Sequence, residues 1–173
     1  MIEFDPVDDI GAGAFGDPGD RVFVIQARKG DARLSVLVEK EQVRMLATEA
    51  QHFLDRIADE DPEENPTATE LAGGAVERDE PLFRARLIGI GYDPDRHLVL
   101  IELREDSDDE DDEEQAEPET TENEGIVARL YATRPQVRAM IRNGVAAVQA
   151  GRPLCPLCDF PMNADGHICP RWN

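Results

Sequence analysis

The chain repeats one local pattern: twice, short apolar segments with the character of antiparallel strands precede a segment with helical periodicity. In the first half, residues 21–28 and 33–38 are short and rich in β-branched side chains, and the residues between them favour a turn, which predicts a β-hairpin. Residues 39–58 then place apolar side chains on one helical stripe. Elements of this kind bury their apolar faces only against one another, which restricts the fold to a few layered arrangements.

The second half of the chain predicts a second hairpin and one further strand. Residues 83–92 and 97–104 flank a turn sequence, Asp93-Pro-Asp-Arg96, and residues 126–131 have the composition of a strand. We therefore expect an α+β protein with an antiparallel sheet of about five strands and two helices packed on it.

The final helix has clear signals at both of its ends. Thr133 and Gln136 have capping-box spacing, Pro135 falls in the first turn, and Gly151 comes just after the last apolar position. The sequence Gln-Val-Arg that begins at Gln136 also occurs at Gln42, near the start of the first predicted helix. This similarity is too short to establish a duplication by itself.

The acidity of the chain belongs to two segments. The net charge is −20, but residues 59–64 and 105–124 hold 18 of the 38 acidic residues, which leaves 20 acidic residues against 18 basic ones. A run of like charges repels itself and buries nothing, so we expect residues 105–124 to be a disordered insertion. The sequence thus predicts an α+β domain from 1–104 and 125–151, interrupted by this insertion and followed by a separate tail at 152–173.

All three cysteines lie in that tail, together with a histidine, as Cys155-Pro-Leu-Cys158 and His167-Ile-Cys169. Two ligand pairs separated by a short loop can complete a tetrahedron around one ion, so the tail predicts a zinc knuckle with Cys155, Cys158, His167 and Cys169 as ligands. Because protein atoms would fill all four positions, we expect this zinc to be structural and not catalytic.

Other chemistry fits the sequence less well. A redox dithiol would need a helix after the Cys-x-x-Cys pair, whereas proline and glycine follow here; an iron–sulfur site and a chance cluster of buried thiols remain as alternatives. The glycines at 11–16 match a dinucleotide motif in text only, because an acidic turn follows instead of a helix, and we expect a tight turn there. Neither Ser35, Ser107, His52 nor His97 has an evident catalytic partner.

Three segments together resemble an actinobacterial family of unknown function: GAFGDPGDRVFVIQAR, LIGIGYDPDRHLVLIELR and the tail CPLC…GHICPRWN. This chain departs from the family pattern at Asp159, where a glycine is usual. The resemblance implies the zinc tail, and genes for a histidine-phosphatase-like and a lipid-kinase-like protein nearby, but no reaction. The tail pattern falls on Cys155, Cys158, Gly166, His167, Cys169, Pro170, Arg171 and Asn173.

Two functions of different classes follow. We expect a cytoplasmic, non-enzymatic interaction or regulatory module with a protein partner, and with neither a nucleic acid nor a membrane as partner. The alternative is a small enzyme or enzyme subunit that acts on a phosphorylated or nucleotide ligand. The candidate contact residues of the module are Phe160, Met162, Arg171 and Trp172, although Trp172 could instead cover the metal site. The enzyme would need a cleft rimmed by Arg84, Arg86, Tyr92, His97 and Arg134.

Overall fold

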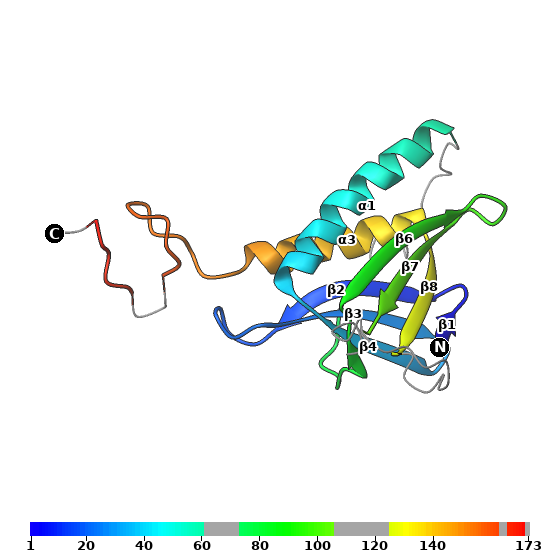
Figure 1. Cartoon of the computed structure of the whole chain (residues 1–173), viewed down its shortest axis with the longest axis horizontal. Helices are drawn as coiled ribbons and strands as arrows, with labels where there is room; N and C mark the ends of the chain where they lie inside the picture. Colours follow the sequence, from blue (N-terminus) through cyan, green and yellow to red (C-terminus); the bar gives the residue numbers. More distant parts are fainter. Residues whose placement is uncertain (61–72, 106–124, 163–165, 172–173) are drawn as a thin grey trace, which may run out of the picture.

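Two four-stranded sheets and two helices make up the computed structural model, which describes residues 1–60, 73–105, 125–162 and 166–171 (Figure 1). The acidic insertion predicted at 105–124 lies outside these described residues except for Glu105. The N-terminal sheet has the order β2 (Asp9–Phe15), β3 (Val22–Lys29), β4 (Ala32–Val38), β5 (Phe83–Arg84). The C-terminal sheet has the order β1 (Ile2–Phe4), β8 (Val127–Thr133), β7 (Leu98–Arg104), β6 (Leu87–Asp93).

The predicted α+β class is confirmed, and the strands are more numerous than expected. Both hairpins form, as β3–β4 and β6–β7. The segment 83–92, expected as one strand, divides into β5 and β6, which belong to different sheets. The strands β1 and β2 carry few of the alternating large apolar residues that identify a strand, and the sequence analysis did not find them.

The helices are α1 (Lys40–Glu60) and α3 (Arg134–Gln149), and the start of α3 is the one that the sequence predicts. The Thr133 hydroxyl accepts a hydrogen bond from the backbone N–H of Gln136, and the Gln136 side chain accepts one from the backbone N–H of Thr133. This reciprocal pair is a capping box, so the prediction from Thr133 and Gln136 is confirmed.

The two halves of the chain have the same order of elements, four strands and then a helix, and each half gives its first strand to the other half. The strand β1 pairs in parallel with β8, and β5 pairs in parallel with β4, so each sheet is completed by a strand from the opposite half. The backbone N–H of Val7 bonds to Tyr131, and that of Ala85 bonds to Leu37, at matching places in the two sheets. The structure therefore contains an internal repeat with exchanged strands.

Gln42 and Gln136 make equivalent contacts in the two halves. The Oε1 atom of Gln42 accepts a hydrogen bond from the backbone N–H of Glu39 (2.7 Å), and its Nε2 donates to the carbonyls of Ala85 (3.2 Å) and Arg86 (3.0 Å). Each glutamine thus fastens the start of its helix to the chain that leads out of an exchanged strand.

The second glutamine repeats this arrangement in the other half. The Oε1 atom of Gln136 accepts from the backbone N–H of Thr133 (2.9 Å), and its Nε2 donates to the carbonyls of Val7 (3.4 Å) and Asp8 (3.0 Å). The short Gln-Val-Arg similarity in the sequence consequently marks a true structural correspondence.

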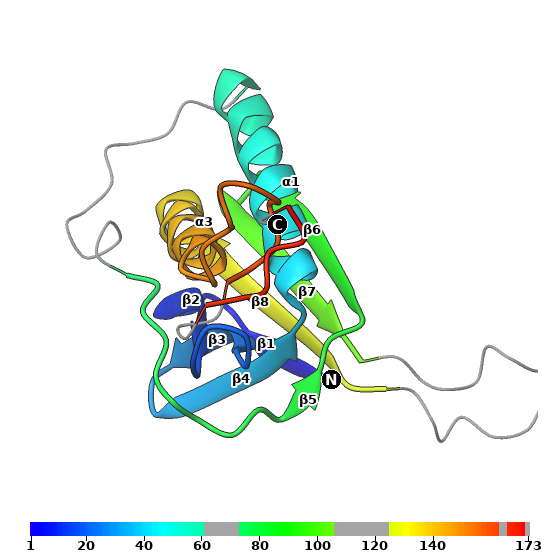
Figure 2. The ribbon, with the colours of Figure 1, turned by 90° about the vertical axis from the view of Figure 1, so that its left-hand side faces the viewer.

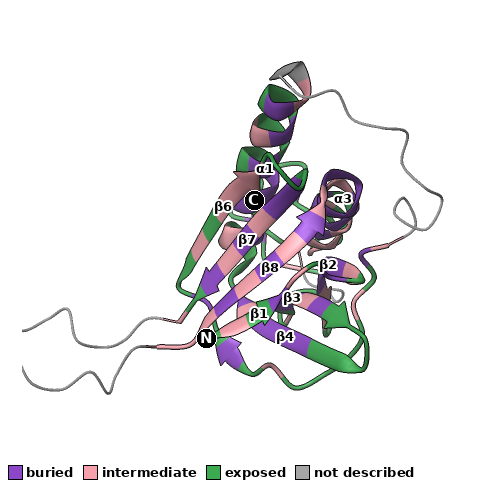
Figure 3. Cartoon of the chain, turned by 90° about the vertical axis from the view of Figure 1, so that its right-hand side faces the viewer, coloured by how far each residue is buried: buried purple, intermediate pink, exposed green. Residues whose placement is uncertain are grey.

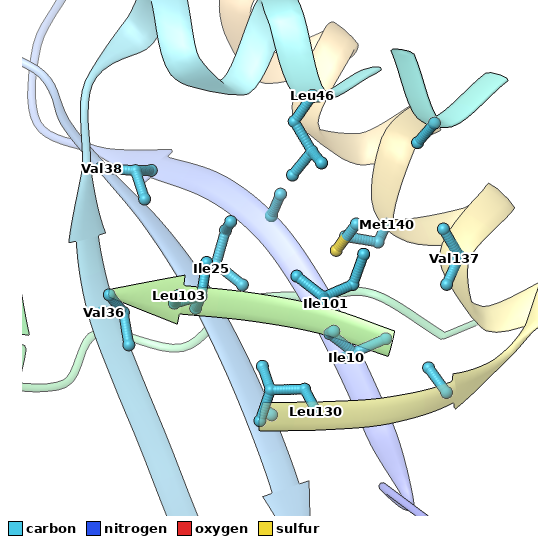
Figure 4. Packing of buried hydrophobic residues seen from close by; sticks show 14 of the residues in the cluster. Ile10, Ile25, Val36, Val38, Leu46, Ile101, Leu103, Leu130, Val137 and Met140 are labelled. Atoms are coloured by element: carbon cyan, nitrogen blue, oxygen red, sulfur yellow. The ribbon is translucent and has the colours of Figure 1, made fainter. Parts of the chain in front are cut away.

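One hydrophobic core fills the space between the sheets and the helices (Figures 3 and 4). Close packing is most evident where α3 crosses β2 and α1: a Cβ added at Gly144 would lie 3.0 Å from Val43 and 3.2 Å from Ala12. The side chains that point into this core in Figure 4 include Ile10, Ile25, Val36, Leu46, Ile101, Leu103, Leu130, Val137 and Met140.

The tight turn expected at the glycines of 11–16 was wrong for Gly11 and Gly13, which lie inside β2, and holds only for Gly16, whose φ of 97° begins the turn that leads to β3. Their outer face is crossed by the chain at 73–77: a Cβ added at Gly11 would lie 2.4 Å from the carbonyl oxygen of Gly74, and one at Gly13 would lie 2.4 Å from Val76. The two glycines therefore permit a close approach of two backbone segments and have no sign of a nucleotide role.

Gln136 provides a test of the fastening contacts. Replacing Gln136 with alanine leaves buried backbone groups without their partners, so we expect the free energy of unfolding to fall by about 1–3 kcal/mol. Gln149→Ala, at the exposed end of the same helix, should change it by less than about 0.5 kcal/mol. Urea unfolding measures both, and equal effects of the two substitutions would contradict the role assigned to Gln136.

Candidate metal centre

A tight turn holds the first ligand pair of the tail. The tail leaves the end of α3 and extends away from the body (Figure 1). The backbone N–H of Asp159 bonds to the carbonyl of Cys155 (2.9 Å), and the N–H of Cys155 bonds to the carbonyl of Phe160 (2.9 Å). An antiparallel bridge between Leu154 and Pro161 closes the base of this turn. These contacts place Cys155 and Cys158 on one tight loop.

The four predicted ligands lie together. One ligand atom from each of Cys155, Cys158, His167 and Cys169 falls within 4.8 Å of the other three. The Sγ atoms of Cys155 and Cys169 are 3.8 Å apart, and Sγ of Cys158 is 3.3 Å from Nε2 of His167. Cys155 and Cys169 are buried, and the other two are half-buried. The second ligand pair, across the loop, therefore faces the first.

These distances fit a single tetrahedral ion. Zinc bonds of about 2.3 Å to sulfur and about 2.0 Å to nitrogen place neighbouring ligand atoms about 3.5–3.8 Å apart in a tetrahedron. A disulfide would need sulfur atoms about 2.05 Å apart, and all three cysteines are free thiols. The cluster could therefore hold one metal ion.

Backbone N–H groups point at the sulfur atoms, as a site for metal thiolates requires. The N–H of Leu157, and after it that of Cys158, lowers the pKa of the Cys155 thiol. Burial raises the pKa of Cys158, while the N–H of Phe160 acts in the opposite direction. Asp159, which precedes that N–H, has φ of 60°, so it adopts the left-handed conformation that favours glycine and that aspartate tolerates.

The local structure of the cysteine pair argues against the alternative of a redox dithiol. A thioredoxin-type cysteine pair opens a helix, whereas Cys155 to Cys158 forms a turn that returns through the bridge to Pro161. The Sγ atom of Cys155 interacts with both Cys158 and Cys169, so the three thiols form one cluster and not an isolated pair. The local fold therefore favours ligation over dithiol exchange.

The residues expected for an enzyme cleft do not meet in one place. The hydroxyl of Tyr92 lies 3.3 Å from Nδ1 of His97, and the Arg134 guanidinium lies 5.6 Å from the centre of the Tyr92 ring. Arg84, however, pairs with Glu39 at the other end of the molecule, and the length of β6, about 20 Å, separates Arg86 from Tyr92. Only three of the five residues therefore converge.

The candidate contact residues of the tail differ in exposure. The Phe160 side chain is 59% exposed, and Met162 is half-buried. Arg171 is exposed and donates a hydrogen bond to the carbonyl of Leu157 (3.0 Å), which links the end of the tail to its first turn. Trp172 lies outside the described residues.

The sequence analysis missed a set of basic residues at the junction of the body and the tail. A pocket of about 280 Å³ opens there. Its basic residues are far apart in sequence and belong to no motif, so only the fold identifies them. The lining residues are Gly19, Arg21, Phe23, Lys40, Val148, Gly151, Arg152, Leu154 and Pro161.

Metal analysis of the purified protein tests the cluster. We expect about one metal ion per chain, because one tetrahedral site uses all four ligands, and its loss on Cys155→Ser. His52→Gln, which removes an exposed histidine of α1, should leave the metal content unchanged. Mass spectrometry under native conditions measures both. Full metal content in Cys155→Ser would exclude Cys155 as a ligand.

Comparisons with known proteins give a family and no function. In the described part of the chain, neither helix has the length and apolar character needed to cross a bilayer. No curated protein and no solved structure matches the chain. One family model, described as "Protein of unknown function (DUF3090)", matches residues 2–169 and so covers nearly the whole chain. The chain therefore belongs to this family of proteins of unknown function.

Proposed function

We propose that this protein is a zinc-binding, non-enzymatic interaction module whose C-terminal knuckle contacts a protein partner. The observation that carries the proposal is the exposure of large apolar side chains on the knuckle. Four of the nine large apolar side chains that are exposed among the described residues belong to the knuckle. These four are Leu154 (60% exposed), Leu157 (49%), Phe160 (59%) and Ile168 (97%).

Zinc is the metal that best suits the ligand set. Three thiolates and one imidazole are soft or borderline ligands, which disfavour magnesium and calcium, and a closed set of this composition is typical of structural zinc. A knuckle of this size buries few apolar side chains of its own, so the ion would supply much of the energy that folds it. With every position filled by protein, no site remains on the ion for a substrate or water.

Exposed apolar side chains on a small rigid element are suited to protein contacts. Burial of such a side chain in an interface contributes roughly 1.5–3 kcal/mol, and aromatic residues such as Phe160 are enriched at interface centres. The metal cluster fixes the backbone on both sides of these residues, because Phe160 follows Cys158 and Ile168 lies between His167 and Cys169. The surface would consequently be ordered before a partner binds, which lowers the entropy lost on association.

Charge and thiol chemistry support the remaining parts of this proposal. Free thiols are kept in reducing compartments, so we place the protein in the cytoplasm, and the tail motif favours an actinobacterial host. A net charge of −20 opposes contact with nucleic acids and with anionic membranes. A protein is therefore the expected partner.

A pull-down from native-host lysate tests the knuckle surface. The full chain should retain a partner that Phe160→Ser/Ile168→Ser loses, because the double substitution removes apolar contact area and leaves all four ligands in place. Leu87→Ser is the matched control, since Leu87 is an exposed leucine (63%) on β6 of the body, and it should retain the partner.

The zinc content of the double variant shows whether loss of the partner reflects lost contacts or a misfolded knuckle. Loss of the partner with one zinc still bound per chain supports a contact role for Phe160 and Ile168. Retention of the partner by the double variant, with its loss from Leu87→Ser, would move the interaction surface from the knuckle to the body.

A further inference from the structure

The pocket at the junction of body and tail is built from four separate parts of the chain. The turn before β3 supplies Gly19 and Arg21, the first residue of α1 is Lys40, and the end of α3 leads into Arg152. The knuckle supplies Leu154 and Pro161, the two residues of the bridge at its base. Figure 2 shows the tail in front of these elements. The pocket is thus closed on one side by the tail.

The charge of the pocket is positive in a strongly acidic chain. Three of its nine lining residues are basic, and none is acidic. Elsewhere on the described surface, basic side chains are mostly neutralised, because eight arginines form ion pairs with carboxylates. These arginines are Arg28, Arg33, Arg44, Arg84, Arg96, Arg104, Arg129 and Arg138.

Two of the three cations keep their charge available. Arg21 donates to the carbonyl oxygen of Ala147 near the end of α3 (3.1 Å), which orients the guanidinium without neutralising it. Lys40 is exposed and forms no ion pair with any described carboxylate. An anion in the pocket would therefore meet Arg21 and Lys40, which form none of the ion pairs found in the described part of the chain.

Two glycines let Lys40 and Arg152 lie close to the backbone. A Cβ added at Gly151 would lie 3.7 Å from Nζ of Lys40, and one added at Gly19 would lie 3.1 Å from Nε of Arg152. Both charged groups consequently lie over backbone atoms at the edge of the pocket instead of extending freely into water. Such placement lowers the entropy lost when they bind a ligand.

The remaining wall is apolar. Phe23 is buried (6% exposed) and Val148 is half-buried, and the knuckle adds Leu154 and Pro161. A pocket of about 280 Å³ is close to the lower limit for small-molecule sites. Three cations beside an apolar wall match an organic molecule that carries a doubly charged group, and a phosphate monoester has a charge of about −1.5 to −2 at neutral pH.

We propose that this pocket binds a phosphate monoester of a small organic molecule. Arg21, Lys40 and Arg152 contact the phosphate, and the organic part lies against Phe23 and the base of the knuckle. Because Leu154 and Pro161 belong to the tail, the metal-folded knuckle completes the apolar wall. The phosphate contacts belong to Arg21, Lys40 and Arg152, and Phe160 and Ile168 do not line the pocket, whereas Leu154 belongs to both the pocket and the exposed surface of the knuckle.

Calorimetric titration of the metal-loaded full chain with phenyl phosphate tests the site. We expect saturable binding of one molecule per chain. Lys40→Gln should weaken it about tenfold, because it removes one charge-assisted contact. The chain has only one other lysine, Lys29, so Lys29→Gln is the matched control and should bind as the unchanged protein does. Lys40 is exposed and forms no ion pair with a described carboxylate, so its replacement should leave the fold intact.

Three further titrants identify the ligand class. Benzoate, with a single charge, and inorganic phosphate, without the aromatic ring, should both bind more weakly than phenyl phosphate. Vesicles that contain phosphatidic acid separate a lipid source of the phosphate from a soluble one, and retention of the protein on them that Lys40→Gln abolishes would assign the monoester to a lipid.

Some outcomes overturn the proposal. They are the absence of saturable binding to phenyl phosphate and to the vesicles alike, and an equal loss in Lys29→Gln and Lys40→Gln, which would indicate unspecific attraction. Equal binding by phenyl phosphate and inorganic phosphate would remove the apolar part of the site. None of these results affects the pull-down, because both lysine variants keep the exposed residues of the knuckle.

Discussion

The exchange of strands β1 and β5 between the two halves is the constraint on which the rest of the fold depends. Each half contributes a three-stranded antiparallel unit and a helix, and each sheet reaches four strands only through a parallel strand from the other half. Gln42 and Gln136 stabilise both crossing points with side-chain hydrogen bonds to the backbone that follows each exchanged strand. The halves therefore form one cooperative body with a single core.

The two halves of the repeat differ in the segments added to them, and we expect the function to depend on these added segments. Within the described residues, a strap crosses the sheet of the first half alone: the chain at 73–82 passes over the outer face of the N-terminal sheet, where Gln26 exchanges two hydrogen bonds with Glu77 and the backbone N–H of Leu82 bonds to the carbonyl of Ser35. Only the second half is followed by the knuckle. The cationic pocket lies where that knuckle meets the first half, so it has no counterpart at the equivalent position of the repeat.

Local signals in the sequence were sufficient for the hairpins, the capping box of α3 and the ligand cluster. Each depends on residues close in sequence, such as Thr133 with Gln136 or Cys155 with Cys158, so spacing alone carries the information. Even the departure at Asp159 could be interpreted, because aspartate tolerates the left-handed conformation that the turn requires.

The features that the sequence did not reveal depend on distant contacts. Gly11 and Gly13 were expected in a turn because the contact that requires glycine there is not local. It is made with Gly74 and Val76, more than 60 residues away in the sequence. The exchange of β1 and β5 has no local signature, since short edge strands with mixed polarity resemble loops. The pocket joins Arg21, Lys40 and Arg152, which no spacing rule connects.

The exchanged strands also set an order for folding during synthesis. The N-terminal sheet needs β5, which ends at Arg84, so it can be completed once about half the chain has left the ribosome. The N-terminal strand β1 must wait for β8, more than 120 residues later, and pays the loop-closure entropy of that long separation. Strand β1 is thus made well before its partner and is among the last strands to pair, so the nascent chain must carry an unpaired edge until β8 has been made.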